Sequence, residues 1–141
     1  MENAMGVKRG MMPEIVVAVA PRRRSNDCGV WAIHTLTGVP YADVAAAAQK
    51  ADRWGGERGL YLSQIIHICE LLGFKVRKRK RVDLEDDTGI LSVWFSKRDG
   101  HVVVLREGEL IDADGTSWKA DDYIAAKGVR VSAILLVEPK T

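Results

Sequence analysis

The chain has 141 residues, of which 47% are hydrophobic and 28% are charged, and its formal net charge is +2. These values are typical of a globular protein with one hydrophobic core, and they exclude a disordered or fibrous chain. The net charge is too small to indicate a nucleic-acid partner by itself. The sequence has only two cysteines, Cys28 and Cys69, so it contains no disulfide framework, and we expect a reducing compartment.

The sequence contains no run of about 20 consecutive apolar residues, which a membrane-spanning helix requires. The apolar run at residues 15–20 is too short for a secretory signal and is followed by Pro21-Arg22-Arg23-Arg24. We therefore expect a cytoplasmic protein with no membrane partner. To act outside the cytoplasm, the protein would have to be delivered by a phage or a secretion system. Residues 1–12 are expected to be flexible, and residues 13–141 to form a single domain.

Three helices are predicted in the first half of the chain, after a short strand at residues 14–20. Asp27 stands at an N-cap position, directly before an apolar segment that ends at Gly38. Gly73 is the expected end of a later segment in which apolar residues recur at helical spacing. The three predicted helices are Cys28–Thr37, Tyr41–Asp52 and Leu62–Leu72.

The second half of the chain is predicted to form mainly antiparallel strands. Its short apolar segments are separated by turns, and the Glu107-Gly108 pair is typical of a tight hairpin. A short helix at residues 120–127, closed by Gly128, precedes the last strand. Helices followed by a meandering sheet indicate an α+β fold. The predicted strands are residues 74–82, 89–95, 101–106, 109–113 and 129–137.

Three residues have the chemistry of a thiol hydrolase. Cys28 begins a helix, His101 begins an apolar strand, and Asp112 lies on the next strand. A thiol nucleophile needs a base that takes its proton, and the base needs a third group that sets its tautomer and orientation. The N–H dipoles at a helix N-terminus and a neighbouring imidazolium both lower the pKa of a thiol. We therefore expect His101 to activate Cys28, and Asp112 to orient His101.

The two-residue turn at Glu107-Gly108 decides which residues face each other across the predicted hairpin. It places residue 103 opposite Asp112 and His101 opposite Asp114, so both carboxylates share a sheet face with the histidine. Asp112 lies within the predicted strand, whereas Asp114 precedes a glycine and is typical of a turn. We predict that Asp112 is the partner of His101, with Asp114 as the alternative.

The segment Asn26-Asp27-Cys28-Gly29-Val30-Trp31-Ala32, with Leu36-Thr37-Gly38-Val39-Pro40-Tyr41 after it, resembles the start of papain-like cysteine peptidases. It is most similar to the small domains related to bacteriocin-leader peptidases, which cut double-glycine leaders in exporters. The resemblance covers residues 22–114 and implies a papain-like fold, in which a central helix starting at the nucleophile and its neighbours pack on a C-terminal antiparallel sheet. It also implies a Cys28, His101 and Asp112 triad.

This resemblance implies a cysteine hydrolase, either a peptidase or an isopeptidase. Such an enzyme cleaves an amide bond of a peptide or protein substrate through an acyl-thioester on Cys28.

Two features depart from this family. Its members usually have a glutamine about six residues before the cysteine, and loss of this oxyanion donor typically costs about 10²–10³ in rate. Here that position is Arg22, and we expect Asn26 to supply the amide, with the guanidinium of Arg22 or Arg23 as the alternative. The hairpin from His101 to Asp112 is also shorter than in the exporter domains, which argues against the same substrate groove.

Two other functions are compatible with the sequence. A murein amidase of the NlpC type would share the cysteine and the histidine, although that family more often has a serine after its cysteine and frequently a histidine in place of Asp112. A papain-like binding module with weak catalysis would instead use the basic segment Lys75–Arg81 to recruit a partner. No aromatic residue interrupts that segment, so we expect no nucleic-acid partner and favour a charged edge strand.

The remaining thiol and imidazoles are expected to have structural or solvated positions. Cys69 falls on the apolar stripe of its helix, His34 lies inside the first helix, and His67 lies on a polar helix face. The cysteines and histidines have no metal-ligand spacing, so we expect no metal and no other cofactor.

Overall fold

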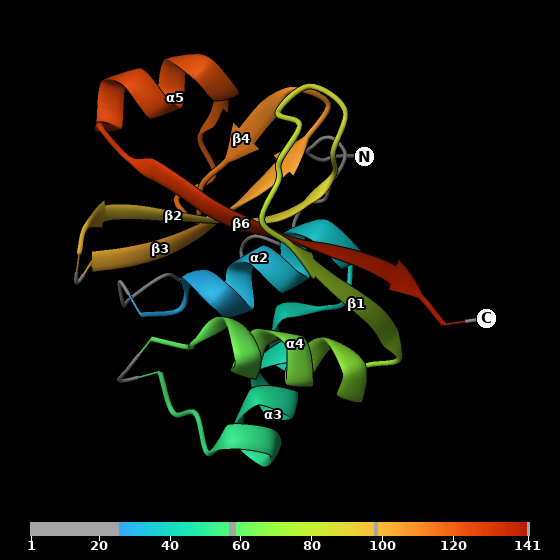
Figure 1. Cartoon of the computed structure of the whole chain (residues 1–141). Coiled ribbons are helices and arrows are strands. Elements are labelled where there is room, and N and C mark those ends of the chain that lie inside the picture. The colour runs from blue at the N-terminus through green and yellow to red at the C-terminus, as the bar shows by residue number, and fades with distance from the viewer. Residues whose placement is uncertain (1–25, 57–58, 98, 141) are drawn as a thin grey trace.

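The computed structural model describes residues 26–56, 59–97 and 99–140, so the predictions for residues 1–12 and 14–20 lie outside it. Within these residues the chain forms four helices and one six-stranded antiparallel sheet (Figure 1). The helices are α2 (Cys28–Thr37), α3 (Tyr41–Asp52), α4 (Leu62–Leu71) and α5 (Ala120–Lys127). The strands are β1 (Phe74–Arg79), β2 (Gly89–Ser96), β3 (Asp99–Arg106), β4 (Glu109–Ile111), β5 (Ser117–Lys119) and β6 (Arg130–Pro139).

The sheet has the strand order β1-β6-β2-β3-β4-β5 and separates two hydrophobic cores. Helices α2, α3 and α4 cover one face, and α5 covers the other (Figure 1). Alternate residues of the central strands enter opposite cores: Val102 and Val104 belong to the first, Val103 and Leu105 to the second. This arrangement confirms the predicted α+β class. No helix in the described part of the chain is long and apolar enough to cross a membrane.

Helix α2 is buried on several sides because it lies between the sheet and the other two helices of its layer. Gly29, directly after Cys28, lets the start of α2 approach α4 closely. A Cβ at this position would lie 3.2 Å from Cδ1 of Ile65 and 3.3 Å from Cδ1 of Leu60. The helix ends at Gly38, whose φ of 80° is left-handed, as the sequence predicts.

The hairpin between β3 and β4 has the predicted register. Glu107 and Gly108 both have positive φ, 52° and 79°, as in the tight turns that match the twist of a hairpin. The pairs Arg106↔Glu109 and Val104↔Ile111 follow from this turn. Continued along the strands, the same register places residue 103 opposite Asp112.

The prediction of a strand over residues 109–113 was wrong at its end. Strand β4 stops at Ile111, and the chain turns: the Asp112 N–H donates to the Thr116 carbonyl at 2.9 Å, and the Gly115 N–H donates to the Asp112 carbonyl at 2.9 Å. The turn leads into β5, which was not predicted because three residues between polar turns have no detectable alternation. Asp112 therefore lies one residue beyond the strand.

Asp27 occupies the predicted N-cap position of α2, but its side chain makes no capping hydrogen bond. The residue is only 3% exposed, and its Oδ2 accepts a hydrogen bond of 3.0 Å from the hydroxyl of Tyr41. The predicted N-cap position is thus confirmed, and the carboxylate links the start of α2 to the start of α3.

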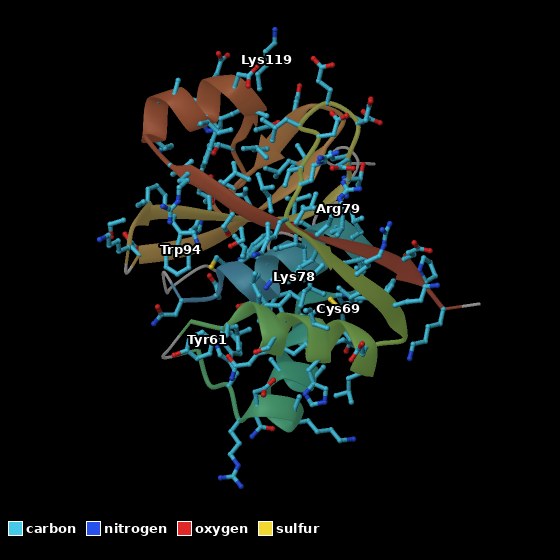
Figure 2. The ribbon with its side chains drawn as sticks, viewed as in Figure 1. Tyr61, Cys69, Lys78, Arg79, Trp94 and Lys119 are labelled. Carbon is cyan, nitrogen blue, oxygen red and sulfur yellow. The ribbon has the colours of Figure 1, made fainter. Side chains whose placement is uncertain are left out.

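Strand β1 lies at the edge of the sheet, as expected for its run of basic residues (Lys78 and Arg79 are labelled in Figure 2). It is shorter than the predicted segment 74–82. The Arg79 guanidinium pairs with Asp87, and its Nε donates to the Arg81 carbonyl at 2.8 Å, so the chain turns away after Arg79.

We expect Gly89→Ala to lower the free energy of unfolding by about 1–3 kcal/mol, the usual cost of overpacking. A Cβ at Gly89 would overlap the backbone carbonyl oxygen of Leu135 on β6, which cannot move aside as a side chain can. Gly59→Ala is the control, since a Cβ there meets no heavy atom within 4 Å. Urea denaturation of both variants measures the difference; equal midpoints would contradict this close approach of β2 and β6.

Candidate active site

Cys28 is the first residue of α2, and its side chain is partly exposed. The helix N-terminus directs backbone N–H groups toward this position, which favours a negatively charged sulfur. Two neighbouring residues of β3 also reach the sulfur: His101 through its side chain and Val102 through its backbone. Cys28 therefore lies where the helical layer meets the central strand of the sheet.

His101 joins the thiol to the sheet. Its Nε2 lies 2.8 Å from Oδ1 of Asp112, and it also makes a side-chain hydrogen bond with Cys28. Because Nε2 is engaged by the carboxylate, Nδ1 is the ring atom that remains for the sulfur. The side chains of His101 and Asp112 are 20% and 17% exposed, so this pair is largely screened from water.

Asp112 receives hydrogen bonds at both carboxylate oxygens. Oδ1 accepts from His101 and from the backbone N–H of Ala113 at 2.7 Å, and Oδ2 accepts from the hydroxyl of Tyr123 at 2.9 Å. Asp114, the alternative partner, is exposed, and its Oδ1 accepts from the N–H and the hydroxyl of Thr116. The structure thus brings Cys28, His101 and Asp112 into one hydrogen-bonded chain and leaves Asp114 outside it.

Burial and hydrogen bonding act in opposite directions on the pKa values of these three groups. Burial by itself would raise the pKa of Cys28, but the hydrogen bond to His101, the imidazolium charge and the backbone of Val102 lower it below its ordinary value. Burial would lower the pKa of His101, whereas its bonds to Asp112 and Cys28 raise it to about 10. For Asp112, burial is outweighed mainly by His101, and the pKa falls to about 2. The arrangement therefore favours the thiolate–imidazolium form over the neutral thiol and imidazole.

The other thiol and imidazoles have the expected structural or solvated positions. Cys69 is fully buried in the first core, and burial raises its pKa to about 12. Nδ1 of His34 lies 2.7 Å from the carbonyl oxygen of Val39, so this histidine packs within its own layer. His67 is exposed on α4. Among the described residues, no three His, Cys, Asp or Glu side chains are grouped in a way that could hold a metal ion.

A cleft of about 710 Å³ lies beside Cys28, His101 and Asp112, which are among the residues that line it. One wall comes from the start of α2 and the loop before α4, the other from the β2–β3 hairpin. Tyr61 and Trp94, on opposite walls, lie on the same side of the molecule (Figure 2). Phe95 is 40% exposed, and its ring lies 5.8 Å from that of His101, centroid to centroid. The site thus lies in an open cleft with partly aromatic walls.

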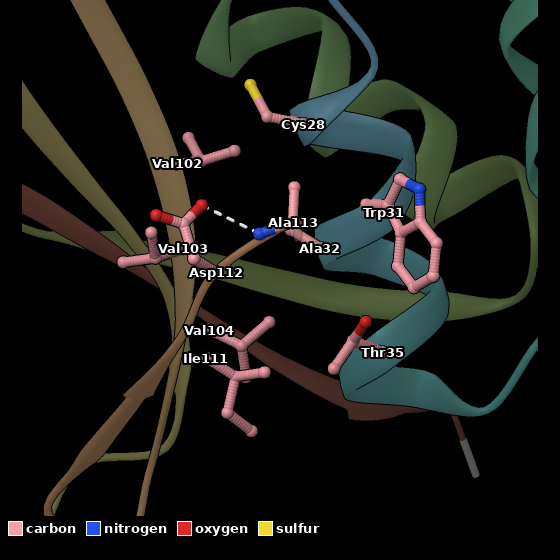
Figure 3. A pocket seen from close by; sticks show the side chains of 10 residues that line it. All are labelled: Cys28, Trp31, Ala32, Thr35, Val102, Val103, Val104, Ile111, Asp112 and Ala113. Carbon is pink, nitrogen blue, oxygen red and sulfur yellow. Dashed lines mark hydrogen bonds between the residues drawn. The ribbon is translucent and has the colours of Figure 1, made fainter. Parts of the chain in front are cut away.

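A smaller cavity lies on the other side of Cys28, between α2 and the strands. Figure 3 shows Ala32 and Thr35 of α2 facing Val104 and Ile111 of the sheet. The side chains along this seam are mostly small or apolar, so α2 packs directly on β3. This packing determines where the helix begins relative to His101.

The predicted oxyanion residues are only partly described. Asn26 lines the cleft together with Cys28 and His101. Arg22 and Arg23 lie outside the described residues. The backbone N–H of Cys28, at the N-terminus of α2, is a second donor that a developing oxyanion could use.

Sequence analysis missed Tyr123, the buried donor to Oδ2 of Asp112. Its position in α5 has no local signal that separates it from an ordinary core tyrosine. The contact depends on the packing of α5 beside the turn that follows β4, which the sequence pattern does not reveal.

No protein-family model matches the sequence, and no curated protein was found to match it. Among solved structures, the fold is similar to the peptidase domain of Streptococcus ComA, a bifunctional ABC transporter involved in a quorum-sensing pathway. The TM-score is 0.60 at 21% sequence identity, over 85% of this chain and 96% of that domain. The predicted similarity of the fold to the peptidase domain of an exporter is therefore confirmed.

We expect brief alkylation of the native protein to label Cys28 at a lower pH than an ordinary thiol requires and to leave Cys69 unlabelled. The thiolate is the reactive form, and the two thiols have pKa values shifted in opposite directions. Because the pKa of His101 is about 10, the ion pair persists from the lowered pKa of Cys28 up to about pH 10. Mass spectrometry after timed quenching measures both sites.

His101→Ala is the informative variant in this experiment. It removes the partner but leaves the sulfur buried, so the pH at which Cys28 becomes reactive should move upward. An unchanged pH profile, or preferential labelling of Cys69, would show that this histidine does not activate the thiol.

Proposed function

From the fold of a papain-like peptidase domain, we propose that the protein is a cysteine peptidase or isopeptidase. In this proposal Cys28 is the nucleophile, His101 the general base and acid, and Asp112 the group that orients His101. One observation carries the proposal: Cys28 at a helix N-terminus, His101 and Asp112 form a continuous hydrogen-bonded chain beside an open cleft. The similarity to a peptidase domain independently favours a peptidase-like function.

In the first half of the reaction, the thiolate of Cys28 attacks the carbonyl carbon of the scissile amide. The carbonyl π electrons move to oxygen and form a tetrahedral oxyanion. As the C–N bond breaks, the imidazolium of His101 gives its proton to the leaving nitrogen, and an amine departs. The acyl group remains on the sulfur as a thioester.

In the second half, neutral His101 takes a proton from a water molecule as that water attacks the thioester carbonyl. The C–S bond then breaks, the carboxylic acid product leaves, and the thiolate–imidazolium pair is restored. Asp112 keeps Nε2 of His101 protonated through the 2.8 Å contact, so that the other nitrogen exchanges the proton in both halves.

The oxyanion would be stabilised by the backbone N–H of Cys28 and by a side-chain donor. We assign the role of side-chain donor to Asn26, which lines the cleft beside Cys28. Its side chain is an amide, like the glutamine that papain-like peptidases usually have. The cleft beside the sulfur suits a peptide or protein segment as the substrate. The basic segment is separated from β3 by β6 and β2, so it does not contribute to this cleft.

We expect the wild-type protein to cleave members of a mixed peptide library, and Cys28→Ala to cleave none. His101→Ala should reduce the rate by about 10²–10⁴, the usual contribution of a general acid–base group. Cys69→Ala is the matched control: it removes the other thiol, which lies in the first core, and should retain cleavage. Mass spectrometry of the peptide products measures the result. Equal product formation by wild type and Cys28→Ala would refute the mechanism.

We expect Asn26→Ala to lower kcat by about 10²–10³ and to change KM little, because an oxyanion contact strengthens only as the charge develops. Steady-state kinetics on a cleaved peptide separate the two constants. Arg22→Ala, measured in parallel, distinguishes the guanidinium alternative. If neither change affects kcat, the backbone acts alone, and a slow enzyme or a binding module becomes the better description.

A further inference from the structure

Tyr123 is fully buried in the second core, and its hydroxyl donates to Oδ2 of Asp112 at 2.9 Å. We propose that Tyr123 is a positioning residue: it anchors one oxygen of Asp112 so that the other remains directed at His101. This inference rests on the proposed function, because the carboxylate that Tyr123 holds is the proposed partner of the base.

The need for an anchor follows from the position of Asp112 in the chain. It lies one residue beyond β4, where the sheet ladder no longer restrains the backbone. Oδ1 accepts from His101 and from the N–H of Ala113, and Oδ2 accepts from Tyr123. With donors at both oxygens, rotation of the carboxylate would break at least one hydrogen bond in a site screened from water. Without the hydroxyl, Oδ2 is free to turn and draw Oδ1 away from the imidazole.

Tyr123 is itself rigidly placed. Its ring meets that of Trp118 edge to face, with centroids 6.0 Å apart and planes at 84°. The Lys127 ammonium lies 5.3 Å from the centroid of the Trp118 ring. Packing in the second core thus fixes the position of the Tyr123 hydroxyl, and the hydroxyl in turn fixes the carboxylate of Asp112, as a supporting residue of a preorganised site must do.

The charges around this bond keep its direction constant over the working pH range. His101 from β3 and Tyr123 from α5 act on the carboxylate of Asp112. The charges of Asp114, on the same turn, and of Cys28, from α2, act on the hydroxyl of Tyr123. Burial and the negative charge of Asp112 raise the pKa of Tyr123, so the hydroxyl remains a donor. The pKa of Asp112 is about 2, so the carboxylate remains an acceptor.

The test is Tyr123→Phe, which keeps the ring and removes only the hydroxyl. We expect kcat on a cleaved peptide to fall about 10- to 100-fold with KM nearly unchanged, as for a small misplacement of a catalytic group. Nuclear magnetic resonance of protein with isotope-labelled histidine gives a second readout without substrate. The Nε2–H proton of His101, identified by its loss in His101→Ala, should exchange faster with water in Tyr123→Phe than in wild type.

Tyr41→Phe is the matched control, since it removes the hydroxyl that donates to the buried carboxylate of Asp27. It should lower the thermal midpoint without changing the exchange of the His101 proton. In an Asp112→Ala background, which has no acceptor for the hydroxyl, Tyr123→Phe should have no further effect on the alkylation rate of Cys28, because its action passes through the carboxylate. If the two substitutions had additive effects on the alkylation rate, the proposal would be overturned. It would also be overturned if Tyr123→Phe were destabilised but kept the wild-type exchange rate of the His101 proton and the wild-type alkylation rate of Cys28.

The two substrate-free readouts separate this proposal from the proposed function. If no peptide is cleaved but proton exchange changes as expected, Tyr123 positions Asp112 in a non-catalytic site. If Tyr123→Phe does not fold, uniform 3-fluorotyrosine labelling keeps the fold and makes the hydroxyl a stronger donor. The His101 Nε2–H resonance should then shift, and an unchanged resonance would overturn the proposal.

Discussion

The alternation of side chains along β3 connects the two cores and the candidate site. Val102 and Val104 enter the core beneath α2, whereas Val103 and Leu105 enter the core beneath α5. At the start of the same strand, the backbone of Val102 and the ring of His101 reach the sulfur. A slip of one residue would exchange the two faces and also remove His101 from Asp112, because the period of a strand is two. Folding and site geometry therefore depend on one register.

The charges of the site are stable only as a group. Partly buried ions cost free energy unless they are paired and hydrogen-bonded. Burial opposes the charged form of Cys28, His101 and Asp112 alike, and in each case contacts with the other members outweigh it. The carboxylate at the end of this chain has the most donors, and they come from β3, from α5 and from its own turn. The thiolate of Cys28, which lies in the layer of α2, thus depends on contacts that Asp112 makes with α5 on the other face of the sheet.

The similarity to the peptidase domain of Streptococcus ComA at 21% identity indicates which constraints define this fold. Few identities are needed because layer packing depends on the spacing of apolar residues and on turn geometry more than on particular side chains. Individual side chains then complete the site. Asn26 stands in the cleft wall, and Tyr123 supports the carboxylate from α5.

The sequence by itself determined the features that arise over a few residues. The bounds of α2 and α5 follow from apolar composition and terminal glycines, and the register that brings Asp112 near His101 follows from a two-residue turn. Tertiary structure decided the rest. The Asp27 carboxylate bonds to Tyr41 instead of capping its helix, β5 pairs with β4, and Tyr123 reaches Asp112. These contacts join residues 6 to 14 positions apart, and they depend on how whole elements pack, which local periodicity does not reveal.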